Sequence, residues 1–251
     1  MATATARPRL NLRSDDLFFS GMAAVALIAV LVGFARTYFL AGLFRAPLPS
    51  LLVHIHGAAF TLWIVLFITQ IALVTARRVD VHRRLGMLGF ALAVAMIVLG
   101  TMTASERLAR RVAHPGRRTV EEVQAFYAIP IADMLMFSTF VYLGYRNRFQ
   151  PAVHKRLMWF ATLSLLDAGF DRWPVFNSYS ASIVNLIYFT PLLMLLIGYD
   201  WWSTGKVQRV TLWSTIFVVV VQQSRHPLGH TAGWQSFASW VATHLHLFPL
   251  R

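Results

Sequence analysis

The chain has 251 residues, of which 57% are hydrophobic and only 13% are charged, and its mean hydropathy is +0.57. Soluble domains carry about 25% charged residues, so one soluble core cannot hold this excess of apolar side chains. The long apolar runs instead predict membrane spans, which must be helical because hydrocarbon offers backbone groups no hydrogen-bond partner.

The formal net charge of +13 does not indicate nucleic-acid binding. The Lys and Arg residues cluster in short segments between apolar runs, which is how multi-pass membrane proteins fix their orientation. We therefore predict the lipid bilayer as partner and no nucleic acid. The chain contains no cysteine, which excludes disulfides, iron–sulfur clusters and thiolate metal sites.

Residues 1–16 are basic and then acidic and predict a cytoplasmic N-terminal segment. The apolar run after them, 17–34, is longer than the apolar part of a signal peptide and lacks a small-residue cleavage site. We therefore expect an uncleaved first span. A transit peptide is the alternative, although Asp15 and Asp16 cut its basic pattern short.

The apolar runs predict an all-α domain, a bundle of about seven membrane helices within residues 17–226. The expected helices cover residues 17–36, 51–76, 85–105, 127–145, 155–174, 181–201 and 208–225. The last of them needs a polar face turned inward, because Gln222 and Gln223 follow its short run "IFVVVV".

The tail, residues 227–251, carries apolar residues at three- and four-residue steps, which predicts an interfacial amphipathic helix. These residues are Trp234, Phe237, Val241, Leu245 and Phe248.

The distribution of basic residues predicts the orientation. With seven spans, 13 of the 23 Lys and Arg residues fall on the side of the N-terminus and 10 on the opposite side. We therefore expect a cytoplasmic N-terminus and an external C-terminus. The segment "RLARRVAHPGRR" (107–118) argues against this orientation, because it places five Arg outside. Directly after it, Thr119 and Glu122 have capping-box spacing, which predicts an early start of the fourth helix.

An internal repeat is visible in the motif V-H-[RK]-R-L. It occurs at Val81–Leu85 and again 72 residues later at Val153–Leu157, each time at the entrance of a span. This spacing predicts a duplicated helical hairpin, helices 2–3 and helices 4–5. The motif either snorkels to lipid headgroups or forms a basic site for an anion, such as a phospholipid phosphate or haem propionates. Its candidate residues are His82, Arg83, Arg84, His154, Lys155 and Arg156.

Two histidines stand at the start of the second span, in "LLVHIHGAAF". Residues two apart lie about 200° apart around a helix, so His54 and His56 cannot face one site. Trp63 and Gln70 follow His56 at seven-residue steps, which turns His56 into the bundle and leaves His54 near the membrane surface.

Ionisable and amide side chains recur at a similar depth in the outer half of the predicted spans. Such groups are costly in a membrane and usually face the interior and mark function. We predict a polar pocket, open to the outer side, that binds a small ligand, a cation or a proton. Its candidate residues are His56, Asp133, Asp167, Asp171, Arg172, Gln222 and Arg225.

Three alternatives stay open for these residues. In the first, Asp167 or Asp171 pairs with Arg172 or Arg225 in a purely structural network. In the second, a divalent metal supports hydrolysis of a lipid or amphiphile. Its ligands would be His56, Asp133, Asp167 and Asp171. The pair His226 and His230 is discounted as metal ligands, because Pro227 and Gly229 are expected to break the helix. The third alternative is a b-type haem held by His82 and His154.

Three motifs resemble those of a group of bacterial multi-pass membrane proteins without an assigned activity. The first is H-G-x-x-F-x-x-W, beginning at His56; the second is H-R-R-L-G at His82–Gly86; the third is H-K-R-L-M at His154–Met158, leading to Asp167 and Arg172. The resemblance covers the second to fifth predicted helices. It implies a bacterial inner-membrane location and no particular reaction.

Overall fold

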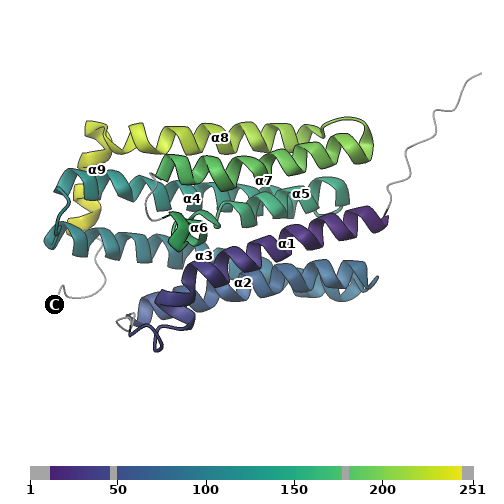
Figure 1. The fold of residues 1–251 in the computed structure, drawn as a ribbon, viewed down its shortest axis with the longest axis horizontal. Helices are drawn as coiled ribbons and strands as arrows, with labels where there is room; N and C mark the ends of the chain where they lie inside the picture. The colour runs from purple at the N-terminus through teal and green to yellow at the C-terminus, as the bar shows by residue number, and fades with distance from the viewer. Residues whose placement is uncertain (1–11, 46–49, 177–180, 245–251) are drawn as a thin grey trace, which may run out of the picture.

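The computed structural model describes residues 12–45, 50–176 and 181–244. Every regular element in these residues is a helix (Figure 1), which confirms the all-α class. The elements are α1 (Leu12–Phe34) with a π-helical turn (Ala35–Phe39), α2 (Leu51–Thr75), α3 (Val79–Ala113), α4 (Val120–Arg146), α5 (Pro151–Leu163), α6 (Asp167–Phe170), a 3-10 turn (Pro174–Phe176), α7 (Ala181–Thr204), α8 (Arg209–Gly229) and α9 (Ala232–His244).

Four helices in the described part of the chain are long and apolar enough to cross a membrane. They are Ser14–Phe39, Leu51–Thr75, Val79–Ala113 and Val120–Arg146. Large apolar side chains on the outside of the bundle, such as Leu62, Leu88 and Val220, are more than half exposed. Exposed apolar surface on this scale fits contact with lipid and not with water.

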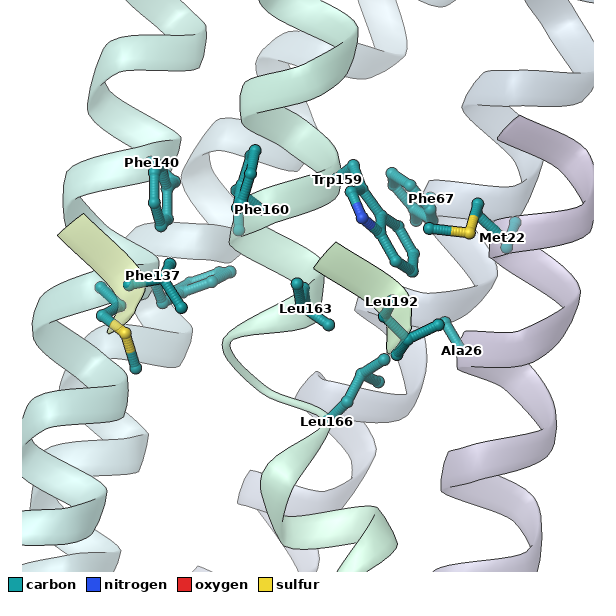
Figure 2. Close-up of a cluster of buried hydrophobic side chains, with 14 of the residues drawn as sticks. Met22, Ala26, Phe67, Phe137, Phe140, Trp159, Phe160, Leu163, Leu166 and Leu192 are labelled. Atoms are coloured by element: carbon teal, nitrogen blue, oxygen red, sulfur yellow. The ribbon is translucent and has the colours of Figure 1, made fainter. Parts of the chain in front are cut away.

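The long helices run back and forth along one axis (Figure 1). Helix α4 is central, in contact with α3, α5, α8 and α9. Figure 2 shows the core between the helices, where aromatic and aliphatic side chains interdigitate. Trp159, Phe160 and Phe137 are fully buried there. This packing holds α1, α2, α4, α5 and α7 as one body around the polar groups described below.

Helices α3 and α4 are longer than predicted. With 35 residues, α3 extends about 52 Å at 1.5 Å per residue, well beyond the ~30 Å of membrane hydrocarbon. The expected capping box is confirmed: the backbone N–H of Thr119 donates to Glu122, the N–H of Glu122 donates to the Thr119 hydroxyl, and α4 begins at Val120. Both helices therefore project past the rest of the bundle at the end that carries α9.

The predicted tail helix exists as α9, and it packs on this projection of α3 and α4. Val241 and Ala238 are buried against Leu108 and Tyr127, and the Trp234 indole N–H donates to the carbonyl of Gln124 over 2.9 Å. Protein therefore covers Val241 and part of Trp234 in the predicted apolar stripe, whereas Phe237 is 45% exposed. Leu245 and Phe248 lie outside the described residues.

The prediction of one continuous helix over 155–174 is wrong. Helix α5 ends at Leu163, a turn follows, and α6 spans only Asp167–Phe170. The turn is buried, with Leu163 and Leu166 fully covered by protein, which is where irregular backbone is tolerated within a membrane protein. Helix α6 lies against α1 so closely that a Cβ atom on Gly33 would lie 2.1 Å from the carbonyl oxygen of Gly169.

The expected helix break at Pro227 is also wrong, because α8 continues through it to Gly229. Proline removes only one backbone hydrogen bond, and here it does so in the last turn of the helix. Gly229 then packs against the backbone of Ala125, where a Cβ atom would lie 2.6 Å from the carbonyl oxygen. The end of α8 and α4 are therefore in direct backbone contact.

Candidate functional site

A buried network joins α4, α6 and α8. The Arg225 guanidinium donates from Nη1 to Oδ1 of Asp133 over 3.1 Å and to Oδ2 of Asp167 over 2.5 Å. The side chains of Arg225, Asp133 and Asp167 are 6%, 13% and 3% exposed, so water screens these charges little. The structure thus brings together three of the residues predicted from the sequence.

Two neutral groups complete the surroundings of Asp167. The Gln222 side-chain amide donates to Oδ2 over 3.3 Å, and the Tyr188 hydroxyl donates to Oδ1. Gln222 was predicted and Tyr188 was not. A tyrosine inside an apolar run looks like an ordinary core residue in a sequence, and here its ring also stacks on Phe170.

Close helix contacts position the network. The contact of Gly33 with Gly169 fixes α6, which begins at Asp167, and the contact of Gly229 with Ala125 fixes the end of α8. The buried stripe of α8 consists of Thr211, Ser214, Val218, Gln222 and Arg225. The structure turns Arg225 inward, as the predicted pocket requires, and exposes His226.

Asp171 and Arg172 lie outside the network, on the exposed side of the turn after α6. Arg172 donates to the carbonyl of Ala168 and stacks over the Phe34 ring, 4.7 Å from its centroid. The predicted pairing of Asp167 with an arginine is therefore made by Arg225.

His56 faces inward as expected and His54 is exposed. The His56 ring packs on Phe60 with centroids 4.1 Å apart, and its Nδ1 atom is buried without a hydrogen-bond partner. In the described residues no three His, Asp or Glu side chains gather closely enough to hold a metal ion. The metal set predicted from His56 and the three aspartates is thus not assembled.

A second buried network lies near the opposite end of α5. Arg156, only 1% exposed, donates from Nε and Nη2 to Oδ1 of Asp200. Oδ2 of Asp200 accepts from the Thr211 hydroxyl over 2.5 Å and from the backbone N–H of Gln208 over 3.1 Å. One guanidinium faces one carboxylate, and both carboxylate oxygens are satisfied. The sequence reasoning missed Asp200, which sits in "IGYDWW" at the end of a predicted span.

The basic residues of the two repeat motifs therefore make different contacts. Arg156 is buried in this second network, and Lys155 pairs with Asp15 over 2.7 Å. Arg83 and Arg84 are exposed. His82 and His154 approach each other, with ring centroids 6.2 Å apart. The six residues do not form a single basic site.

A cavity of about 430 Å³ lies where the ends of α4 and α8 meet the turn between α3 and α4, and none of the network residues lines it. Ile129 lines it one helical turn before Asp133, and His226 lines it next to Arg225. The remaining lining residues are mostly charged or aromatic: Arg117, Arg118, Glu122, Ala125, Phe126 and His230. Arg107 and Arg118 both lie over the Phe126 ring, so the rim of the cavity is basic.

No protein-family model, curated protein or solved structure matches this chain. The chemistry of the site follows from its groups. Two carboxylates, one guanidinium, an amide and a phenol offer several proton positions in a buried place.

Proposed function

We propose that this chain is a multi-pass membrane protein whose Asp133–Asp167–Arg225 network binds a proton. A charge imbalance in the network is the main support, because two buried carboxylates share a single guanidinium. If both were ionised, the trio would carry a net charge of −1 in a poorly screened place, which is costly. A proton on one carboxylate removes that charge.

The Arg156–Asp200 pair in the same molecule supports this assignment by contrast. There, one carboxylate meets one guanidinium, and hydroxyl and backbone donors complete its hydrogen bonds. A balanced pair of this kind has no need of a further ion. The unbalanced trio does, and an excess charge retained inside a membrane bundle is typical of proton and ion pathways.

The ligand count favours a proton over a metal cation. Within the described residues no third carboxylate or imidazole joins Asp133 and Asp167, and two carboxylates are too few ligands for a divalent ion.

The proposal includes a placement in the membrane. In it the chain crosses seven times, with α5 and α6 together forming the fifth crossing, in a bacterial inner membrane. The basic-residue distribution supports a cytoplasmic N-terminus, so the cavity opens on the outer face. The alternation of helix directions along the bundle is consistent with this arrangement (Figure 1).

A second candidate is a purely structural network, and the low exposure of Arg225 and Asp167 favours it. In that case the trio joins α4, α6 and α8 and both aspartates stay ionised. The two candidates differ in one observable, the presence of a protonated carboxyl group.

Infrared spectroscopy of the full chain in liposomes at neutral pH tests the proposal. We expect a carboxylic-acid carbonyl band that shifts in deuterated water and disappears in Asp133→Asn or Asp167→Asn. Asp200→Asn is the matched control and should keep the band. If the wild-type band is absent, the network is structural. A melting temperature that rises with Na⁺ or Ca²⁺ but not with choline would instead assign a bound cation.

A further inference from the structure

Two imidazole rings face each other at the end of the bundle opposite the cavity. His82 lies in the first turn of α3 and His154 in the first turn of α5. Their ring centroids are 6.2 Å apart and their planes are nearly perpendicular, at 87°. Both residues are half-buried, and neither takes part in the two ionic networks.

The internal repeat accounts for this meeting. His154 is 2.9 Å from the carbonyl oxygen of Gly144 in α4, and Gln70 in α2 holds the equivalent place beside His82. Trp63 and Phe137 are 74 residues apart, as Gln70 and Gly144 are, and their rings pack edge to face at 5.0 Å. His82 contacts its repeat equivalent His154, and Trp63 contacts its equivalent Phe137. Such contacts indicate that the two helical hairpins run parallel and are related by one rotation axis.

The hydrogen bonds leave imidazole lone pairs available. A carbonyl only accepts, so Nδ1 of a neutral His154 carries the hydrogen and Nε2 keeps its lone pair. Histidines that bind metals are commonly oriented by this kind of contact. Nδ1 of His82 is buried without a hydrogen-bond partner, and so is Oε1 of Gln70. Unpartnered buried polar atoms on two neighbouring residues call for a ligand.

We propose that His82 and His154 bind a single copper(I) ion between them. Two metal–nitrogen bonds of about 2.0 Å and two imidazole radii of about 1.1 Å place ring centroids roughly 6 Å apart, as observed. Met158 follows His154 by one turn of α5, so the two side chains lie on the same face of the helix. Imidazole with a nearby thioether suits copper, and the thioether selects its monovalent form.

The charge of the site agrees with a monovalent ion. The proposed ligands are neutral. Lys155 and Arg156, which follow His154, pair with carboxylates, whereas Arg83 and Arg84, which follow His82, are exposed and add positive charge. Positive surroundings disfavour a divalent ion more than a monovalent one. This site does not depend on the proton proposal, since the two share no residue.

The test uses the full chain, purified in mild detergent and stripped with a chelator. It is titrated under reducing conditions with copper(I) against a colorimetric copper(I) chelator, and separately with Zn²⁺ and haemin. We expect one copper per chain in the wild type and at least a tenfold loss of affinity in His82→Gln and in His154→Gln. His54→Gln replaces an exposed histidine and should bind like the wild type.

X-ray absorption of the copper-loaded wild type tests the ligands without any substitution, and should show two nitrogen neighbours. Weak, non-stoichiometric copper, or equal binding by the two His→Gln variants, overturns the proposal. Tight Zn²⁺ binding in place of copper, or a Soret band lost in both variants, also overturns it. The latter would assign the two imidazoles to haem iron, which uses the same kind of axial pair.

Discussion

Asp133 and Asp200 are both buried partners of an arginine. Replacing Asp200 with asparagine should lower the free energy of unfolding much more than replacing Asp133. Asp200→Asn leaves Arg156 buried without the counter-charge of Asp200, which typically costs about 3–5 kcal/mol. Asp133→Asn leaves Arg225 paired with Asp167, so we expect a change within about 1 kcal/mol. The free energy of unfolding in mixed detergent micelles, followed by tryptophan fluorescence, measures both.

Asp80→Asn is the control for these two variants, because Asp80 pairs with Arg78 on an exposed helix end. Exposed pairs contribute little, so this variant should match the wild type. A loss of stability in Asp133→Asn as large as in Asp200→Asn would show that Arg225 needs both aspartates ionised. That result would favour the structural network over the proton site.

The sequence indicated which residues belong to the first network, but it did not indicate which of them pair with each other. Asp133, Asp167, Gln222 and Arg225 were predicted because charged and amide groups in apolar runs are rare and costly. Which group pairs with which depends on helix rotation, and one residue is a rotation of about 100°. Tyr188 could not be predicted, because a tyrosine among apolar residues carries no sign of its hydrogen bond.

At the scale of the elements, α1 and α6 depend on two glycines in contact. A methyl group on Gly33 would overlap the carbonyl oxygen of Gly169, which belongs to backbone and cannot rotate away. We therefore expect Gly33→Ala to destabilise the chain by about 1–3 kcal/mol, as overpacking does. It should also displace Asp167 from Arg225, because α6 begins at Asp167. Unfolding in mixed micelles and the infrared carboxyl band measure the two effects.

Gly21→Ala in the same helix is the matched control. A Cβ atom there meets no other atom within 4 Å, so the variant should be neutral or slightly more stable, since alanine is the better helix former. If both variants behave alike, the contact between α1 and α6 contributes nothing to the position of Asp167.

Helix ends were the part of the elements that the sequence predicted least well. Charge suggested a loop over "RLARRV", but Arg, Leu and Ala are strong helix formers, and the α3 helix continues to Ala113. The break after Leu163 had no sign of its own, because Ser164–Leu166 contains neither proline nor glycine. It arises from tertiary contact, since α6 must leave the line of α5 to pack on α1.

At the scale of the whole molecule, the orientation decides what the basic cavity faces. The chain lacks cysteine, so single cysteines report topology without background. Ala76→Cys and Ala113→Cys form a matched pair, because both alanines are exposed, neither is charged, and they lie near opposite ends of α3. With a cytoplasmic N-terminus, a membrane-impermeant maleimide should label Ala113→Cys in intact cells, and Ala76→Cys only after permeabilisation.

The other outcomes are equally specific. Labelling of Ala76→Cys alone would reverse the orientation and place the cavity, with Arg117 and Arg118, on the cytoplasmic side. Labelling of both from outside would mean that α3 does not cross the membrane, despite a length of 35 residues. The predicted orientation depends on a small difference, 13 basic residues on one side against 10 on the other. Five of the 10 lie at the α3–α4 end, so this part of the chain has the largest influence on whether the orientation is reversed.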